Sequence, residues 1–433
     1  MAAMTLAPIA SAERLRGVDI ARGIALLGIL FVNARFFFAP ISFALASPTA
    51  LDGSPREVPD ITAWALVDTF CSYKFISLFS MLFGFGLAMQ AARARASGES
   101  RWPMGLRRLA LLAAVGIVHW SLIWYGDILM IYALLGVIVL ACTGFAQRTV
   151  GIIVLAMAGV VALMALVLGA LTGLGMMLEA AATGATVAAS DGVAQRGFAA
   201  MVAADFNPDA PVWIEAERAA FQEGPFADAL LFRCVLYAFG FIAGVFSYGW
   251  QSLFMMLCGV YAFKAGLFAP EGSALRRKVA LPALLLGVVV AASGVLAPIV
   301  FGFDSAGASA THTALVALGA MVLPFAYAAI IIEWGPRLPA FLATPLERTG
   351  RMSFTVYLSE SLICTALASW WGLAWFGTID DAQAALIAVC VWLALVVFAT
   401  AWLSVFRIGP FEWFWRVATY GRGGGRNTIQ TAA

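Results

Sequence analysis

The sequence predicts an all-α, polytopic integral membrane protein, and three observations support this fold class. Of the 433 residues, 63% are hydrophobic and only 12% are charged, and the mean hydropathy is +0.93. A soluble domain is about half apolar and about a quarter charged. Apolar runs of about 20 residues, the length that a membrane helix needs, recur along the whole chain. The sequence shows no strand pattern, no soluble domain and no internal repeat.

Ten apolar stretches are predicted to cross the membrane. They are 22–44, 66–90, 106–124, 128–146, 150–173, 249–268, 280–302, 312–333, 352–371 and 383–406. An eleventh stretch, 229–248, is also apolar. Because cytoplasmic loops are rich in Lys and Arg, the basic loops at 91–108 and 276–278 should both lie inside, which holds only if 229–248 does not cross. We therefore expect 229–248 to be an interfacial or re-entrant helix on the outer side, with about ten spans and both termini cytoplasmic.

This topology divides the chain into five parts. They are a cytoplasmic N-terminus (1–18), a five-helix membrane half (19–173), an outer acidic segment with the interfacial helix (174–248), a second five-helix half (249–416) and a disordered cytoplasmic tail (417–433). The six cysteines form no C-x-x-C pair, so neither a metal site nor a disulfide framework is expected. The expected partner is the lipid bilayer. We expect no nucleic acid and no bound cofactor, and the sequence allows a homodimer.

The segment HWSLIWYGD (119–127) places ionisable side chains in an apolar run. His119 is a candidate general base, because the pKa of an imidazole lies near neutral pH. Asp127 could orient that imidazole if a turn at Tyr125-Gly126 brings the two together. The structural alternatives stay open: His119 could make a packing hydrogen bond between helices, and Asp127 could cap the next helix. Trp124 would either wall the site or belong to an interfacial aromatic belt.

Ionisable groups in other spans are also candidates, because charges inside a membrane are costly and tend to mark functional interiors. Asp19 and Arg22 share one helix face and form either a local ion pair or an anion-binding mouth. Asn33 lies farther along the same helix, where a packing bond is the alternative. Lys74 lies mid-span and needs a partner, for which Asp68 is one candidate.

Further candidates follow in the second half of the chain. Arg351 precedes the ninth span, in which Tyr357 and Glu360 share one face. A glutamate buried at this depth is expensive unless it is paired or protonated. His312 is expected to be an interface residue near the outer end of the eighth span.

The predicted depths place these candidates along one track. Asp19, Arg22 and Arg351 lie at the cytoplasmic mouth, Lys74, Tyr357 and Glu360 near the middle, and Asn33, His119 and Asp127 toward the outside. The glycines at 84 and 86 are expected to permit close helix packing.

Five segments occur in the order known from one protein family. They are RGVDIARGIALLGILFVN (16–33), KFISLFSMLFGFG (74–86), RRLALLAAVGIVHWSLIWYGDILMIYALLG (107–136), GRMSFTVYLSESLI (350–363) and FRIGPFEWFWR (406–416). Together they resemble the YeiB-like family of bacterial inner-membrane proteins (domain of unknown function 418) over roughly 14–421. The H-x-x-x-x-W-x-G-D-I-L and G-P-x-E-W-x-W-R blocks are specific, whereas the opening R-G-x-A-L-L-G-I-L block is shared more widely.

The opening block also resembles a larger group of membrane acyltransferases, which includes the acyltransferase-3 proteins and the lysosomal heparan N-acetyltransferase. This resemblance implies a pore-like interior, an acyl-CoA donor such as acetyl-CoA from the cytoplasm, and a small-molecule, glycan or lipid acceptor on the other side. The family usually reads T-N-Y-L-x-Q-S where this chain has T-V-Y-L-S-E-S, so Val356 and Glu360 point to a different substrate if those amides bind it. The heparan enzyme has its catalytic histidine before the second span, where this chain has none, so the role could pass only to His119.

Two main hypotheses follow for function. The first is a membrane acyltransferase, in which Arg22 and Arg351 hold donor phosphates and His119, oriented by Asp127, deprotonates the acceptor. The second is a transporter or flippase for a small amphiphilic metabolite, with Lys74 and Glu360 as coupling charges. Transporters often have inverted repeats and helices that are broken at matching places. The sequence shows neither, which favours the enzyme. A third hypothesis is a structural or lipid-binding protein.

Overall fold

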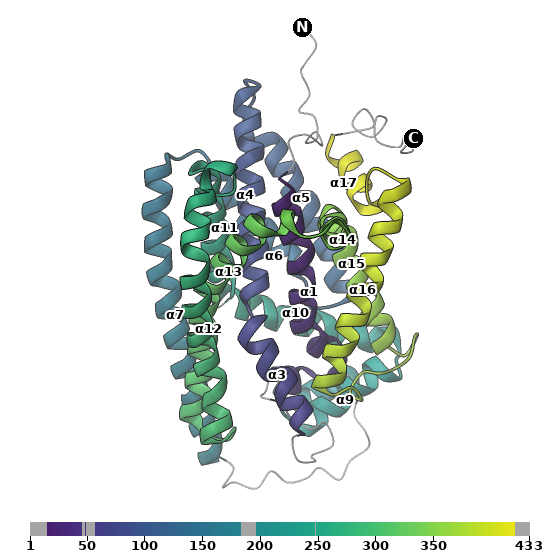
Figure 1. Ribbon diagram of the computed structural model, residues 1–433. Helices are drawn as coiled ribbons and strands as arrows, with labels where there is room; N and C mark the ends of the chain where they lie inside the picture. Colours follow the sequence, from purple (N-terminus) through teal and green to yellow (C-terminus); the bar gives the residue numbers. More distant parts are fainter. Residues whose placement is uncertain (1–14, 46–47, 49–56, 183–195, 247, 421–433) are drawn as a thin grey trace.

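The computed structural model describes residues 15–45, 48, 57–182, 196–246 and 248–420, and these residues form helices and loops without strands (Figure 1). In the first half, the helices are α1 (Arg16–Phe38), α2 (Ile41–Leu45), α3 (Val58–Phe70), α4 (Lys74–Ala96), α5 (Arg101–Val118), the π-helix η2 (His119–Ile123), α6 (Leu129–Cys142) and α7 (Gln147–Ala182). Helices α8 (Gly197–Ala203), α9 (Pro211–Gln222) and α10 (Phe226–Phe246) follow. The all-α prediction is therefore confirmed for the described residues.

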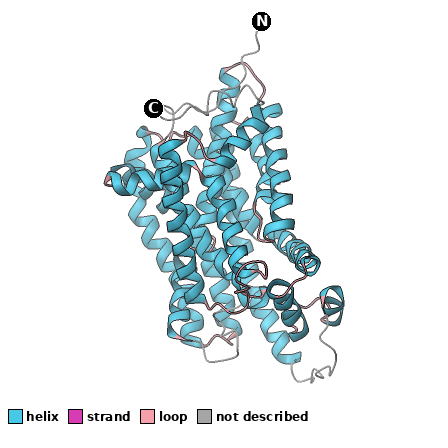
Figure 2. Cartoon of the chain, turned by 90° about the vertical axis from the view of Figure 1, so that its right-hand side faces the viewer, coloured by secondary structure: helices cyan, strands magenta, loops and turns pink. Residues whose placement is uncertain are grey.

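The second half is also helical. It contains α11 (Tyr248–Lys264), η3 (Pro270–Gly272), α12 (Ser273–Phe301), α13 (Ala306–Trp334), η4 (Gly335–Arg337), α14 (Ala340–Arg351), α15 (Ser353–Ala368), α16 (Asp381–Val405) and α17 (Pro410–Tyr420). Figure 2 shows these helices as one bundle in which most axes run along its length. The predicted disordered tail lies mostly outside the described residues.

Eight helical segments in the described part of the chain are long and apolar enough to cross a membrane. They are 16–38, 58–96, 101–123, 147–178, 226–244, 270–301, 306–337 and 381–405, and α6 and α15 are shorter apolar helices. The chain is thus a multi-pass membrane protein. Helix α10 meets the length and composition of a span, in contrast to the interfacial or re-entrant helix that we expected at 229–248. Helix α7 continues to Ala182, past the predicted end at 173.

One of the predicted spans is broken, and another changes its helix type near its end. The predicted helix 66–90 is interrupted between α3 and α4, where Tyr73 has a left-handed φ of 63°. The predicted helix 106–124 changes to a π-helix at His119, and an irregular stretch then leads to α6 at Leu129. Irregular backbone at membrane depth is tolerated only where protein or a water-filled cavity surrounds it. A broken helix is therefore present between α3 and α4, contrary to the expectation from sequence.

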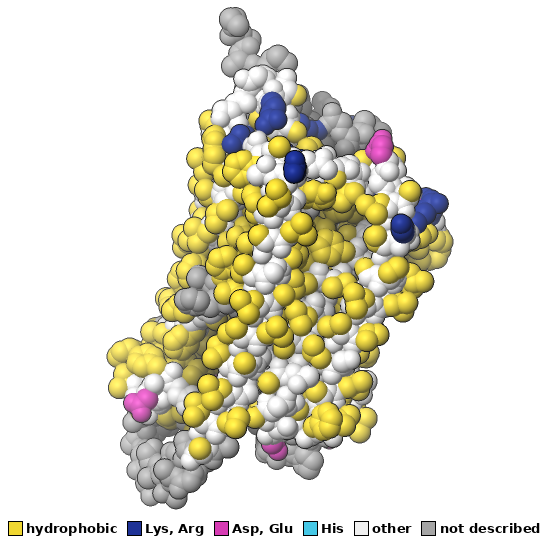
Figure 3. All heavy atoms as spheres, turned by 90° about the vertical axis from the view of Figure 1, so that its left-hand side faces the viewer, with side chains coloured by type: hydrophobic (Ala, Val, Ile, Leu, Met, Phe, Trp, Pro, Cys, Tyr) yellow, Lys and Arg dark blue, Asp and Glu magenta, His cyan; other side chains and the backbone are white. Residues whose placement is uncertain are grey.

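The two ends of the bundle differ in charge. Helices α1 and α5 begin, and α17 ends, at the same end of the molecule, at the top of Figure 1. On the face in Figure 3 a broad apolar surface covers the middle, and basic side chains gather near this upper end. Near this end of α13, the carboxylate of Glu333 accepts hydrogen bonds at 2.7–3.2 Å from the side chains of Ser273, Arg276, Arg277 and Arg337. Basic residues at one end are typical of the cytoplasmic side.

Helix α1 lies inside the bundle and packs against α4, α13, α14, α15 and α16. Its closest approach is to α14, where a Cβ atom on Gly350 would lie 1.7 Å from the carbonyl oxygen of Asp19. Since only glycine fits there, α14 and the arginine at its end are held against the start of α1. This contact places Arg351 beside Asp19 and Arg22.

The acidic segment 174–248 places a buried carboxyl group at the end of the bundle opposite the basic end. Glu217 on α9 is fully buried and accepts hydrogen bonds from Ile41 N and from the Trp213 indole, each at 3.2 Å. Burial raises the pKa of Glu217 from 4.5 to about 8, although both hydrogen bonds lower it. The protonated side chain thus ties α9 to the start of α2.

We expect this carboxyl group to make stability depend on pH. Because its folded pKa lies above its unfolded value, its contribution is complete below about pH 4.5 and is lost as the pH rises through about 8. The loss is about 1.4 kcal/mol for each pH unit between the two values. Melting temperatures between pH 5 and 8.5 should therefore fall in the wild type. The Glu217→Gln variant, which keeps a carbonyl acceptor, should show a flatter profile, and equal slopes would contradict this account.

Candidate functional site

A cavity of about 1270 Å³ lies inside the bundle and is lined by residues from α1, α3–α6 and several later helices. Seven of the ten predicted substrate-binding or catalytic side chains line it, together with many apolar ones. They are Asp19, Arg22, Asn33, Trp124, Asp127, Arg351 and Tyr357. The sequence-based track thus coincides with a real internal space along most of its length.

Arginines crowd the end of the cavity at which α5 begins and α17 lies. The lining there includes Arg22, Arg93, Arg101, Arg108, Arg351, Arg407 and Arg416. The carboxylate of Asp19 accepts from Arg22 Nη1 at 3.0 Å, so the predicted ion pair is present. Only one other carboxylate, that of Glu412, lines this end among the described residues. The excess of guanidinium groups suits an anion with several phosphates, because arginine binds phosphate in a bidentate manner.

Glu412 closes this end by capping α15. Its Oε1 accepts from the backbone N–H groups of Phe354 and Thr355 at 2.8 and 3.0 Å, and its Oε2 accepts from the Thr355 hydroxyl at 2.5 Å. A carboxylate at a helix N-terminus satisfies free N–H groups and is favoured by the helix dipole. The glutamate of the G-P-x-E-W-x-W-R block therefore fixes the first turn of the helix that carries Tyr357.

The predicted pair of His119 and Asp127 is formed. Nδ1 of His119 lies 3.0 Å from Oδ1 of Asp127, an ion-pair distance without hydrogen-bond alignment, and both side chains are almost fully buried. The other carboxylate oxygen accepts from Met130 N at 2.9 Å, in the first turn of α6. Asp127 therefore does both things considered from sequence: it holds the helix start and it contacts the imidazole.

Aromatic rings surround this pair. The ring of Tyr357 lies 5.3 Å from that of His119, and Trp124 stacks on Phe37 at 4.0 Å. A Cβ atom on Gly126 would lie 2.2 Å from the Trp124 ring, so glycine at this turn lets the indole fold back over the chain. Asp127, Trp124 and Tyr357 face the cavity, whereas His119 does not line it and lies behind them.

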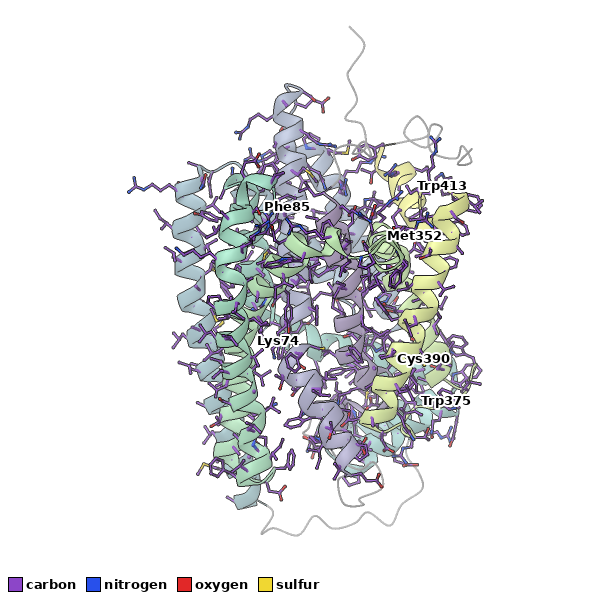
Figure 4. The ribbon with its side chains drawn as sticks, in the orientation of Figure 1. Lys74, Phe85, Met352, Trp375, Cys390 and Trp413 are labelled. Carbon is purple, nitrogen blue, oxygen red and sulfur yellow. The ribbon has the colours of Figure 1, made fainter. Side chains whose placement is uncertain are left out.

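Lys74 and Glu360 are buried but do not line the cavity. Nζ of Lys74, at mid-height in Figure 4, donates to the backbone carbonyl of Asp68 at 2.5 Å rather than to its carboxylate. Oε1 of Glu360 has no hydrogen-bond partner among the described residues. These two side chains therefore stand apart from the other candidates.

A second imidazole–carboxylate pair, which was not predicted from the sequence, also lies at the cavity. Nε2 of His312, which we expected to be an interface residue, lies 2.8 Å from Oδ2 of Asp68. Both residues line the cavity. The only signal available was that a buried aspartate needs a partner and that the chain has two histidines. Both histidines of the sequence are thus paired with aspartates next to one cavity.

Comparison with known proteins finds relatives along the whole chain. The profile of a family described as "Protein of unknown function (DUF418)" matches residues 262–422. The chain is 30% identical over 409 residues to the "Uncharacterized protein YeiB" of Escherichia coli (strain K12), covering 94% of this chain and 96% of that protein. It is also 30% identical over 428 residues to the "Uncharacterized protein YxaH" of Bacillus subtilis (strain 168), covering 96% of both. These alignments cover nearly all of the chain, and the family profile includes α12 to α17.

Proposed function

Because the chain belongs to the YeiB-like DUF418 family of membrane proteins, we propose that it is an acyltransferase of the bacterial inner membrane. The donor would be a cytosolic acyl-CoA such as acetyl-CoA, and the acceptor would lie at or beyond the outer face of the membrane. The observation that carries this proposal is the cavity, which has seven arginines at one end and imidazole–carboxylate pairs deeper along it.

The donor fits the basic end by charge. Coenzyme A carries a diphosphate and a ribose phosphate, and the guanidinium groups at this end supply matching donors. Arg22 and Arg351 both line the cavity beside the contact between α1 and α14, so both could bind one anion there. The thin pantetheine arm would then extend past Trp124 and Tyr357, which wall the cavity.

Transfer of the acyl group needs a proton to be moved. An acceptor hydroxyl or amine attacks the thioester carbonyl, its proton is taken up by a base, and the thiolate leaves. In this proposal the buried His119–Asp127 pair lies beside the reacting carbonyl. Asp127 faces the cavity, and His119 lies behind it. Asn33, which also lines the cavity, would hydrogen-bond the substrate.

The proposal is tested by thermal unfolding of the purified protein with CoA and with acetyl-CoA. A ligand at 100 times its dissociation constant should stabilise the protein by about 2.7 kcal/mol. Arg22→Ala should lose most of this shift. Arg148→Ala is the matched control, because Arg148 is exposed at the start of α7 and lies outside the cavity. Absence of a shift in the wild type with either ligand would reject the acyl-CoA site.

A second candidate function is a transporter for a small amphiphilic anion. The broken helix between α3 and α4 beside the cavity favours it, because transporters often build their sites from such helices. Against it, neither Lys74 nor Glu360, the proposed coupling charges, lines the cavity. Uptake of a labelled metabolite into proteoliposomes that do not bind acetyl-CoA would favour the transporter.

A further inference from the structure

The pair of His312 and Asp68 has the arrangement of a base and its orienting carboxylate. One carboxylate oxygen of Asp68 lies 2.8 Å from His312 Nε2, and the other accepts from the Ser72 hydroxyl at 2.5 Å. Because Asp68 engages Nε2, the nitrogen of His312 that remains for a substrate is Nδ1. A carboxylate placed in this way fixes the tautomer of the imidazole and stabilises its protonated form.

The two histidines differ in their access to the cavity. The side chain of His312 is 19% exposed and lines the cavity, whereas that of His119 is 1% exposed and does not. The indole of Trp64 lies 5.1 Å from the His312 ring, which supports the ring on one face. A substrate in the cavity can therefore touch His312 directly.

His312 and Asp68 lie far from the basic end of the bundle. His312 is in the second turn of α13, and Glu333, which binds three arginines of the basic end, is 21 residues further along the same helix. At 1.5 Å per residue this separation is about 30 Å. A donor held at the arginines and an acceptor at His312 would thus approach the middle of the cavity from opposite ends.

The backbone at this pair is strained, as is common at functional sites. Asp68 and Ser72 flank the break between α3 and α4, in which Tyr73 adopts a φ of 63°. A non-glycine residue in this conformation persists only where its surroundings hold it. Lys74 stabilises this backbone conformation, since its ammonium group donates a hydrogen bond to the carbonyl oxygen of Asp68.

We propose that His312, oriented by Asp68, is the base that deprotonates the acceptor at the outer end of the cavity. This inference rests on the proposed acyltransferase function. The acceptor O–H or N–H bond breaks and its proton passes to His312 Nδ1. The acceptor atom forms a bond to the thioester carbon, the carbon–sulfur bond breaks, and the thiolate leaves with the electron pair. The proton on His312 then passes through water to the thiolate, which restores the base. The buried His119–Asp127 pair does not take this proton.

The experiment uses acetyl-CoA as the donor and two small probes, water and hydroxylamine, as acceptors. General-base catalysis contributes about 10²- to 10⁴-fold. His312→Gln should therefore lower the hydrolysis of acetyl-CoA by at least about 100-fold. Hydroxylamine, a strong nucleophile that attacks without a base, should restore transfer in this variant. Acetyl-CoA should stabilise the His312→Gln variant against thermal unfolding as much as it stabilises the wild type. Thr311→Val, an exposed neighbour on α13, is the matched control and should behave as the wild type.

The outcomes separate this inference from the function on which it rests. Hydrolysis at the wild-type rate by a His312→Gln variant that binds acetyl-CoA would overturn the role of His312 and leave acyl transfer standing. A wild type that neither binds nor cleaves acetyl-CoA would overturn both. A variant that loses transfer to water and to hydroxylamine alike would mark His312 as structural and overturn the base role.

A second measurement needs no variant. Diethyl pyrocarbonate, with the modified residue located by mass spectrometry, should react at His312 before His119 and should abolish hydrolysis as it does so. Prior reaction at His119, or activity that survives complete modification of His312, would overturn the proposal.

Discussion

Replacing Glu333 by alanine is expected to lower the free energy of unfolding by about 3 kcal/mol, the low end of the range for a broken buried ion pair. Although Glu333 lies near the edge of the bundle, its side chain is only 2% exposed because three arginines cover it. Without the carboxylate, Arg276 is left buried without its counter-charge, with only 10% of its side chain exposed. Both its remaining bonds are to the backbone carbonyls of Leu267 and Ala269.

Unfolding in mixed micelles, followed by tryptophan fluorescence, measures this effect. The matched control is Glu347→Ala, which removes a pair with Arg16 whose side chains are 25% and 42% exposed. Such a surface pair contributes less than about 1 kcal/mol. Equal losses in the two variants would show that burial of the Glu333 cluster does not matter.

The second large effect is expected at the crossing of α4 and α11. A Cβ atom on Gly84 would lie 1.9 Å from the carbonyl oxygen of Met256, and one on Gly259 would lie 1.9 Å from that of Met81. Neither backbone atom can move away without separating the helices. Gly84→Ala should therefore destabilise the protein by about 3 kcal/mol or more, at the upper end for overpacking. We expect a loss of the monodisperse peak in size-exclusion chromatography.

Gly86 gives the control, two residues further along α4. A Cβ atom there would meet only Arg22 Nη2, at 3.8 Å, which is an ordinary contact. Gly86→Ala should be neutral or slightly stabilising, since alanine favours a helix by up to about 1 kcal/mol over glycine. A Gly84→Ala protein that is as stable as Gly86→Ala would contradict the close crossing. Of the two glycines expected from sequence to permit close packing, only Gly84 does so.

The contacts that could best be predicted from the sequence are those between residues that lie close together along the chain. The contact between His119 and Asp127 needs only a turn over eight residues, and the Tyr125-Gly126 step indicates where that turn falls. The Asp19–Arg22 pair is one helix turn long. Both follow from local geometry, so both could be stated before the fold was known.

The features that could not be predicted from the sequence depend on which helix faces meet. His312 and Asp68 are 244 residues apart, and nothing local to either residue indicates the other. The lining of the cavity raises the same difficulty: Lys74 and Glu360 are as ionisable as Arg22, but their helix faces turn away from the space. Charge asymmetry likewise predicts the side of a loop and not the length of a helix. It excluded 229–248 as a span, although this apolar stretch lies in α10, which has the length of one.

Helix α6 connects the two ends of the cavity mechanically. Asp127 holds its first turn through Met130 N, and Arg101 at the basic end donates to the carbonyl oxygen of Leu140 near its last turn, at 3.2 Å. Between these anchors the helix is a stiff rod of about 15 Å. Under the proposed function, an anion that drew Arg101 away from Leu140 would shift α6 and with it the placement of Asp127 against His119. By linkage, a substitution that displaces Asp127 would then change the affinity for that anion.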